Sequence, residues 1–477
     1  MVGRWGASTS PVEPGGDTHR RASARRTTRH LLAASGLALI LVVAGSPTPN
    51  ERTRFAERSL TSQTAVLTPA GVVTVRADDV LERFEGTNVQ LTQEGDAEHE
   101  ASVALADDQR RWLAAGVVPG PEAYEDMARQ ALLDLDTLLL EDGALLAAPN
   151  GAWRYTWPRD ASFAAVALSR TGHADDAARI LLRLAALQSE DGTFQARYLP
   201  GDSGLPPDDR GIQLDCDGWF LWAAAEWLRH ADTDVTADTD SAAVLAELRP
   251  ALTRAVDAIA AVTDPVTGSP AVSPDYWEVK ETRVTLGSIS ALLLGVRSVQ
   301  ELAGDLPQGA DRLWAADLAR RGALLEVLLD GAVQRDFAAH GYPRHAGGVL
   351  LDAAVAFLMP PFAPADDAVV DAWERASVGM LRPAGGLAPG EGWRSDGISW
   401  TPQTALFALA AAGSGDDERA AVWLTWLDEH RTEAGSLPEK VLWDGRPAAV
   451  APLSWTSALV LLALVELDER QVEVATR

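Results

Sequence analysis

Beyond residue 120 the chain is patterned almost wholly as helix. Alanine- and leucine-rich segments place apolar residues at positions i, i+3, i+4 and i+7, and clusters of Gly, Pro and Asp separate these segments. Strand-like alternation nearly vanishes from this region, so an all-α fold is expected. Twelve helices are predicted, over residues 121–141, 160–171, 173–189, 215–231, 242–263, 281–303, 309–330, 349–358, 367–381, 399–413, 416–430 and 452–469.

The linkers between these helices alternate in length. Short linkers such as TGHAD and GSGDD are followed by long ones rich in Gly, Pro and aromatic residues. This alternation suits a closed double ring of helix pairs, in which the long loops gather at one end and build a site there. An open solenoid would show a repeat of fixed length and sequence, and none is found. The pattern therefore predicts a twelve-helix toroid over residues 119–470.

The chain before this region divides into two further segments. Residues 1–46 read as an export signal, because a basic stretch precedes an apolar stretch of 16 residues at 31–46. That is shorter than the roughly 20 apolar residues of a spanning helix, so a cleaved signal is favoured over a retained N-terminal membrane anchor. Residues 47–118 are polar and mixed, and they are expected to form a lead-in with little regular structure. Its one alternating run, GVVTVRADDV, is a candidate strand.

Composition limits the class of ligand. The 68 acidic and 41 basic residues give a formal net charge of −27, which argues against nucleic acid or an anionic membrane as partner. A neutral, sugar-like ligand fits better. Cys216 is the only cysteine, and the eight histidines form no HxxxH or HxH pair, so neither a metal nor another cofactor is expected. We expect a monomer located outside the cytoplasm, touching a membrane only through an uncleaved N-terminus.

The first long loop with candidate chemistry reads GAWRYTWPRDASF, residues 151–163. Arg159 and Asp160 stand at a predicted helix start, close to Tyr155 and Trp157. Asp160 could serve simply as the N-cap of the helix. Alternatively, aromatic faces stack on sugar rings while a carboxylate and a guanidinium bind neighbouring hydroxyls. Spacing alone leaves both interpretations open.

A second candidate loop, SPDYWEVKETR, carries a possible general acid. If Glu278 lies in an apolar pocket walled by Trp277, desolvation raises the pKa of its carboxyl, as a general acid near neutrality requires. Alternatively, Glu278 and Glu281 form a solvated first turn that complements the helix dipole. For Glu281 the solvated interpretation is preferred.

Glu439 is the candidate partner carboxylate. It follows Pro438 in GSLPEKVLWDGRPAAVAPLSW, near Trp455, and a closed toroid would bring this loop to the same mouth as Glu278. Two opposed carboxylates in an aromatic pocket meet the requirement of glycoside hydrolysis. Taken alone, PEK is also an ordinary solvated turn.

The loop PPDDRGIQLDCDGWF, residues 206–220, has a more structural character. Trp219, Trp222 and Trp227 recur at helical spacing, which indicates core packing. Cys216 is interpreted as a small buried residue and not as a nucleophile, since no histidine is near it in sequence.

At these motifs the chain resembles the glucoamylase-like glycoside hydrolases of family 15. The segments YTWPRDASF, QLD, DYWEV and LPEKVLWDG…PLSW occur in the order and at about the spacings of that family, and the resemblance runs from about residue 121 to 470. It implies an (α/α)6 toroid, the six-hairpin barrel, which agrees with the twelve helices predicted from periodicity. It also implies hydrolysis of the glucan 1,4-α-glucosidase type.

The resemblance assigns roles to particular residues. Glu278 would be the general acid and Glu439 the general base, acting across about 6.5–9.5 Å to invert the anomeric centre and release β-glucose. Arg159 and Asp160 would hold the non-reducing terminal glucose. The pocket would be lined by Tyr155, Trp157 and Trp277 and closed by Trp455.

Some positions depart from the family pattern. Val279 follows the acid, where some members carry a second carboxylate. The later arginine of an RYP motif has only Arg382 and Arg394 as candidates. The full N-terminal β-sandwich of bacterial members is absent or truncated.

Three functions follow from this reading. The leading one is a secreted, exo-acting, inverting glycoside hydrolase that acts on the non-reducing ends of α-glucans or α-gluco-oligosaccharides. A trehalase of the same fold is the second, and a catalytically decayed sugar-binding protein is the third. Because both Glu278 and Glu439 are present, decay is disfavoured, and the aromatic loops disfavour a pure protein-interaction scaffold.

Overall fold

A computed structural model of the chain describes residues 55–201, 203–231, 240–306 and 310–476. The predicted export signal, residues 1–46, lies outside the described residues. Among the residues described, no helix is both long and apolar enough to cross a membrane. The described residues from 55 onward, which include most of the polar lead-in and the helical region, form one compact unit.

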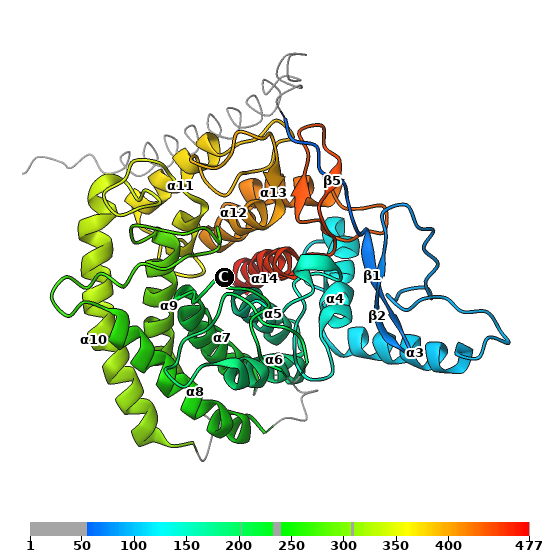
Figure 1. The fold of residues 1–477 in the computed structure, drawn as a ribbon, viewed down its shortest axis with the longest axis horizontal. Coiled ribbons are helices and arrows are strands. Elements are labelled where there is room, and N and C mark those ends of the chain that lie inside the picture. Colours follow the sequence, from blue (N-terminus) through cyan, green and yellow to red (C-terminus); the bar gives the residue numbers. More distant parts are fainter. Residues whose placement is uncertain (1–54, 202, 232–239, 307–309, 477) are drawn as a thin grey trace, which may run out of the picture. The chain divides into compact units, whose positions relative to one another are not determined.

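Helices dominate the described part of the chain (Figure 1). The α-helices are α3 (His99–Ala115), α4 (Glu125–Leu138), α5 (Pro158–Arg170), α6 (Ala174–Leu187), α7 (Asp215–Ala231), α8 (Ser241–Val262), α9 (Leu286–Leu302), α10 (Arg312–Asp336), α11 (Asp367–Gly379), α12 (Thr401–Ser414), α13 (Asp417–Glu429) and α14 (Ser454–Thr476). Short 3₁₀ helices are η1 (Glu122–Tyr124), η2 (Gly151–Trp153), η3 (Ala338–His340) and η4 (Ala353–Leu358).

From α4 to α14 these helices alternate between an outer and an inner ring. The inner ring closes in the order α5, α7, α9, η4, α12 and α14, because each contacts the next and α14 returns to α5. The outer helices α4, α6, α8, α10, α11 and α13 each pack against an inner one. The predicted (α/α)6 toroid is therefore confirmed.

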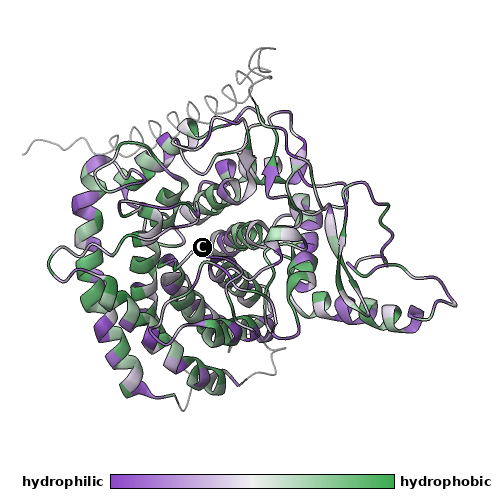
Figure 2. Ribbon diagram, in the orientation of Figure 1, coloured by the Kyte–Doolittle hydropathy of each residue, from purple (hydrophilic) through white to green (hydrophobic). Residues whose placement is uncertain are grey.

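The inner helices are buried on nearly every side, whereas the outer ones are amphipathic. All residues of α5 except Arg170 are buried, and α9 is almost equally enclosed. Figure 2 shows α9 as largely hydrophobic and α10 with hydrophilic residues along its length. Small residues allow the inner helices to approach closely. A Cβ added at Gly295 of α9 would lie 2.6 Å from the Cα of Gly218 on α7, so only glycine fits at this crossing.

One of the twelve predicted helices differs in kind. The segment predicted as helix 349–358 is the 3₁₀ helix η4, which begins at Ala353 after the N-cap Asp352. It is short because Met359, Pro360 and Pro361 follow, and proline cannot continue a helix. The prediction therefore started too early, since Val349 and Leu350 lie exposed in the preceding loop.

The lead-in has more regular structure than the sequence indicated. The alternating run does form β2 (Gly71–Val75), which pairs antiparallel with β1 (Thr64–Thr68), and α3 adds 17 residues of helix. The expectation of little regular structure was wrong for this segment. Helix α3 escaped notice because its buried stripe is half polar, with Ser102 and Gln109 alternating with Ala106 and Leu113.

The lead-in packs on the loop that precedes α14. Thr61 N donates to the carbonyl of Ala449 at 2.7 Å, and the hydroxyl of Ser62 donates to the carbonyl of Ala451 at 2.8 Å. The same loop joins a small sheet of order β3 (Ser399–Trp400), β4 (Lys440–Val441) and β5 (Pro447–Ala448). The loop that carries Glu439 is thus fixed from two sides.

The close helix crossing gives a stability prediction. Gly218→Ala would drive a Cβ into the backbone carbonyl of Ala291, so the inner helices must separate and the midpoint of thermal unfolding should fall by several degrees. Gly331→Ala on α10 is the matched control, because an added Cβ there meets nothing within 4 Å. Since alanine favours helix over glycine, this variant should unfold at the same or a slightly higher temperature. Equal midpoints in a calorimetric scan would contradict the packing argument.

Candidate active site

The long loops gather at the N-terminal ends of the inner helices, where they enclose a cavity of about 330 Å³. Loops before α5, α7, α9, α12 and α14 all contribute to its wall. Seven of the eight site residues predicted from the sequence line it, namely Trp157, Arg159, Asp160, Trp277, Glu278, Glu439 and Trp455. The eighth, Tyr155, is not in the wall but packs beside Trp157, with ring centroids 6.1 Å apart.

Glu278 sits on a strained turn that directs its carboxylate into the cavity. Its φ of 53° lies in the left-handed region, which a glutamate rarely adopts, and its amide donates to the carbonyl of Asp275 at 2.7 Å. Trp157 Nε1 donates to Oε1 of the carboxylate. The alternative of a solvated first turn is wrong for Glu278, because α9 begins only at Leu286, after the N-cap Thr285.

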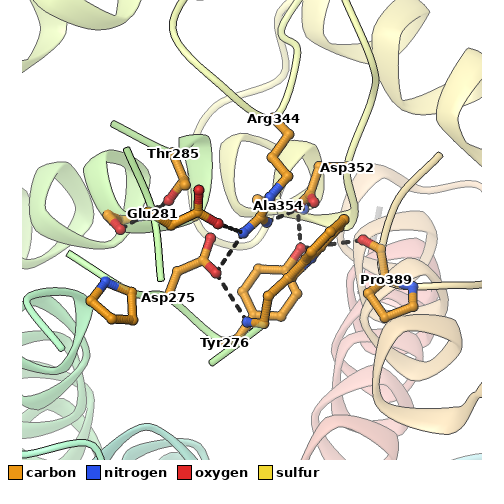
Figure 3. Close-up of polar contacts among 12 residues, drawn as sticks. Asp275, Tyr276, Glu281, Thr285, Arg344, Asp352, Ala354 and Pro389 are labelled. Carbon is orange, nitrogen blue, oxygen red and sulfur yellow. Dashed lines mark hydrogen bonds and ion pairs between the residues drawn. The ribbon is translucent and has the colours of Figure 1, made fainter. Parts of the chain in front are cut away.

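A buried guanidinium, Arg344, holds this acid-bearing loop in place (Figure 3). Its Nη2 donates to Asp275 Oδ1 at 2.8 Å and to Glu281 Oε1 at 2.7 Å, and its Nη1 donates to Asp352 Oδ2 at 2.9 Å. The guanidinium also lies over the ring of Trp277, 3.6 Å from the centroid. Burial opposes its charge, yet the surrounding carboxylates raise the pKa of Arg344 above its ordinary value.

Glu281 is one of the partners of Arg344 and is not solvated. Its side chain is only 7% exposed, and besides Arg344 it contacts His345 Nε2 at 2.7 Å. The preferred interpretation of Glu281 as a solvated helix start was therefore wrong. It assumed that the helix begins at residue 281, whereas residues 281–284 continue the loop.

Neither arginine proposed from the sequence for the later substrate contact lines the cavity. Arg382 and Arg394 are both absent from its wall, and Arg344, in GYPRH, is the buried arginine behind it. The sequence carried one usable signal, which was overlooked: the loop of Arg344 precedes an inner helix, as the other site loops do.

Glu439 faces the cavity from a fixed backbone. Its amide donates to the carbonyl of Val450 at 2.8 Å, and its own carbonyl accepts from Thr401 N at 3.2 Å. The residue is buried, with Oε1 3.2 Å from Lys440 Nζ, while Oε2 has no hydrogen-bond partner among the described residues. Burial lowers the pKa of Lys440, although the neighbouring carboxylate opposes this shift. Glu439 is thus no solvated turn, and one oxygen of its carboxylate is buried and unpaired among the described residues.

The two residues Arg159 and Asp160 form a buried pair within the first turn of α5. The N-cap is Trp157, so the interpretation of Asp160 as a simple cap is wrong. Arg159 Nη2 lies 3.0 Å from Asp160 Oδ2, and its guanidinium lies 4.5 Å from the ring centroid of Trp455. Burial outweighs the pairing and raises the pKa of Asp160. Arg159 Nε and Nη1 are buried and have no hydrogen-bond partner in the described ranges.

The residues of α7 that were predicted to be buried in the core are buried there. Trp219, Trp222 and Trp227 are buried in the core, and Cys216 is fully buried with its pKa raised by desolvation. Asp215, one position earlier, lies outside the cavity wall, and burial raises its pKa to about 7. No group of three or more His, Cys, Asp or Glu side chains in the described residues is arranged to hold a metal ion.

Several wall residues were missed from the sequence, chiefly arginines and tryptophans. They include Arg58, Arg197, Arg210, Trp393 and Trp400. Arg197 stacks against Tyr155 and Trp157 at 4.7 and 4.9 Å, and Trp393 meets Trp277 edge to face at 4.8 Å. Arg210 lies in the loop 206–220, which was interpreted as structural, and the place of each of these residues depends on a loop path that periodicity does not reveal.

Comparison with known proteins agrees with this architecture. No family model matches the chain. The chain is 28% identical to an isomaltose glucohydrolase of Kribbella flavida over 373 residues, which span 68% of this chain and 88% of that protein. A glycosidase solved in complex with glucose superposes with a TM-score of 0.58 at 22% identity, covering 75% and 98% of the two chains. A bacterial glucoamylase complexed with acarbose gives a TM-score of 0.59 at 17% identity, covering 79% and 62%.

These similarities confirm the resemblance to glucoamylase-like glycoside hydrolases and the prediction that the chain is a glycoside hydrolase. The structural matches establish the fold. The sequence match extends over most of the toroid.

The buried cluster of Arg344 with Asp275, Glu281 and Asp352, called the Arg344 hub, gives a second prediction. Arg344→Met would leave three buried carboxylates without their counter-charge, so the free energy of unfolding should fall by about 3–5 kcal/mol. Arg320→Met is the control, because Arg320 pairs with Asp317 on the exposed face of α10, where such pairs contribute about 0–1 kcal/mol. Urea unfolding followed by tryptophan fluorescence measures both. A loss in Arg344→Met no larger than in the control would show that the hub does not hold the loop.

Proposed function

We propose that this protein is an exo-acting, inverting α-glucosidase that removes the non-reducing terminal glucose of a short α-gluco-oligosaccharide and releases β-glucose. The observation that carries the proposal is the meeting of Glu278 and Glu439, from loops before different inner helices, in the wall of one cavity. Aromatic rings and the Arg159–Asp160 pair complete that wall. Two carboxylates in an aromatic pocket are the equipment of glycoside hydrolysis.

Each carboxylate has a distinct task in this mechanism. Glu278 gives its proton to the glycosidic oxygen as the bond from that oxygen to the anomeric carbon breaks, so the leaving sugar departs as a neutral alcohol. Glu439 accepts a proton from a water molecule, and that water attacks the anomeric carbon from the opposite face. One water is consumed, and the configuration of the released glucose is inverted.

The cavity suits a small sugar. Its volume of about 330 Å³ is at the low end of small-molecule sites, which favours a disaccharide or short oligosaccharide over a polymer lying in a groove. Arg159 and Asp160 are placed to bind neighbouring hydroxyls, and Trp277, Trp393 and Trp455 offer apolar surface to the sugar rings. The relative that hydrolyses isomaltose makes an α-1,6-linked disaccharide the first substrate to test.

We also propose that the enzyme acts outside the cytoplasm. The basic and apolar pattern of residues 1–46 supports export, with cleavage favoured over a retained anchor. Trehalose hydrolysis remains the second candidate activity, because the same acid and base would serve it. A sugar-binding protein without catalysis is the third.

Replacing either carboxylate tests the proposal. Glu278→Gln and Glu439→Gln should each lower kcat for isomaltose by at least about 10³-fold, because an amide neither donates the proton nor activates water. The thermal unfolding midpoint should change little. Glu418→Gln, an exposed position in the first turn of α13, is the matched control and should keep full activity.

Glucose release from isomaltose, maltotriose and trehalose is assayed in parallel with each variant. Near-normal turnover by Glu278→Gln would remove the acid assignment. If the unmodified protein binds these sugars but releases glucose from none of them, the sugar-binding function replaces the enzymatic one.

A further inference from the structure

The carboxylate of Glu278 has a cationic partner that the mechanism above does not use. Arg210, on the loop before α7, forms an ion pair through Nη1 with Oε2 of Glu278. Its Nε also lies 3.3 Å from Asp208 Oδ2. Arg210 and Glu278 both line the cavity. Arg210, which comes from a separate loop, therefore contacts Oε2 of Glu278, the oxygen to which Trp157 does not donate.

This ion pair conflicts with acid catalysis. A general acid must carry a proton, whereas a guanidinium in contact favours the ionised carboxylate. Trp157 Nε1 already donates to Oε1, so Oε2 is the oxygen that must hold the proton and meet the glycosidic oxygen. While Arg210 stays at Oε2, neither the proton nor the substrate can take that place. One of the two donors has to leave.

Arg210 is the donor that is able to move. Trp157 is buried at the start of α5 and packs against Arg197, whereas the Arg210 side chain is 35% exposed on a loop. Asp208 offers Arg210 a second partner. The hydrogen bond from Arg197 lowers the pKa of Asp208, so this carboxylate stays ionised and can retain Arg210 after it leaves Glu278.

Resting on the proposed glycosidase function, we infer that Arg210 is the counter-ion of Glu278 in the free enzyme and that the leaving-group sugar displaces it toward Asp208 when substrate binds. Arg210 is thus a positioning residue that couples occupancy of the leaving-group site to protonation of the acid. Substrate binding then takes up one proton from solvent onto Oε2. That proton passes to the leaving oxygen, and Glu439 later releases to solvent the proton that it took from water.

Other charged groups also face Glu278 and bear on its titration. Those in the cavity wall are Arg58, Arg159, Asp160, Arg197 and Glu439, and Arg344 with Asp275 lies behind the acid loop. Arg159 pairs with Asp160, Arg344 with Asp275, and Arg197 with Asp208. Arg58 lies over Trp153 instead, with its guanidinium carbon 6.0 Å from the ring centroid. Arg58 therefore supplies a control cation in the same wall.

The pH dependence of kinetics separates the free enzyme from the complex. The basic limb of the pH profile of kcat/KM reports the pKa of the general acid in the free enzyme. The basic limb of the pH profile of kcat reports the pKa of the same acid in the enzyme–substrate complex. With Arg210 displaced by substrate, the limb of kcat/KM should lie at lower pH than the limb of kcat. Arg210→Gln removes the cation, so the limb of kcat/KM should move to higher pH by about one unit or more, while the limb of kcat stays in place.

Two control variants sharpen the test. Arg210→Lys keeps a positive charge and should hold the limb of kcat/KM nearer its original position than Arg210→Gln does. Arg58→Gln should leave the separation of the two limbs unchanged. If Arg210→Gln alters the size of kcat/KM without shifting its limb, Arg210 has only a structural or binding role and the inference is wrong.

A binding measurement tests the same idea without turnover. In a Glu439→Gln background, where the base no longer titrates, isomaltose binding is followed by titration calorimetry in buffers of different ionisation enthalpy. Between the two limbs, binding should take up a sizeable fraction of one proton, and adding Arg210→Gln should abolish this uptake. Absence of uptake in the Glu439→Gln protein would overturn the displacement.

Failure of this inference is distinguishable from failure of the proposed function. If the unmodified protein hydrolyses isomaltose but its two basic limbs coincide, only the role of Arg210 falls. If it releases no glucose from any α-glucoside, the glycosidase function falls and the role of Arg210 falls with it.

Discussion

Burial of the inner helices on nearly every side is the constraint from which the site follows. A helix enclosed in this way leaves little room along its length for charged side chains, so most polar chemistry gathers at its ends. The short linkers leave little chain at one end of the ring, and the long loops all precede inner helices at the other. Residues far apart in sequence, such as Glu278 and Glu439, are therefore brought into the wall of one cavity.

Carboxylates that are buried together need counter-charges or hydrogen bonds to offset the loss of their hydration. Desolvation raises the pKa of Asp160, Asp215 and Asp352 despite nearby arginines, which means that the fold bears an electrostatic cost here. Arg344 offsets part of that cost by pairing with Asp352. By stacking on Trp277, it also fixes the strained turn of Glu278. Acids with perturbed pKa values and strained backbone positions are both enriched at functional sites.

The sequence predicted the ring of helices well because its signal is repetitive. Every predicted helix from 121 onward has a counterpart, and seven of the eight predicted site residues line the cavity. What it missed depends on contacts between distant segments. Arg344 stands in a stretch that no motif marked, and Arg210 stands in the loop 206–220, which was interpreted as structural. Their roles exist only because loop paths bring them to Asp275 and Glu278. Helix α3 was missed for a local reason, since its buried face is too polar to show in the pattern.

Glu278 and Glu439 are proposed to act on opposite faces of one glucosyl unit, and the configuration of the glucose released first shows whether they do. Proton NMR resolves the two anomers of glucose as it is released, before mutarotation mixes them. During early hydrolysis of isomaltose by the chain lacking residues 1–46, an inverting mechanism predicts an excess of β-glucose over the anomeric mixture that the reducing end contributes. An early excess of the α anomer over the anomeric mixture that the reducing-end glucose contributes would contradict the inverting pair of carboxylates.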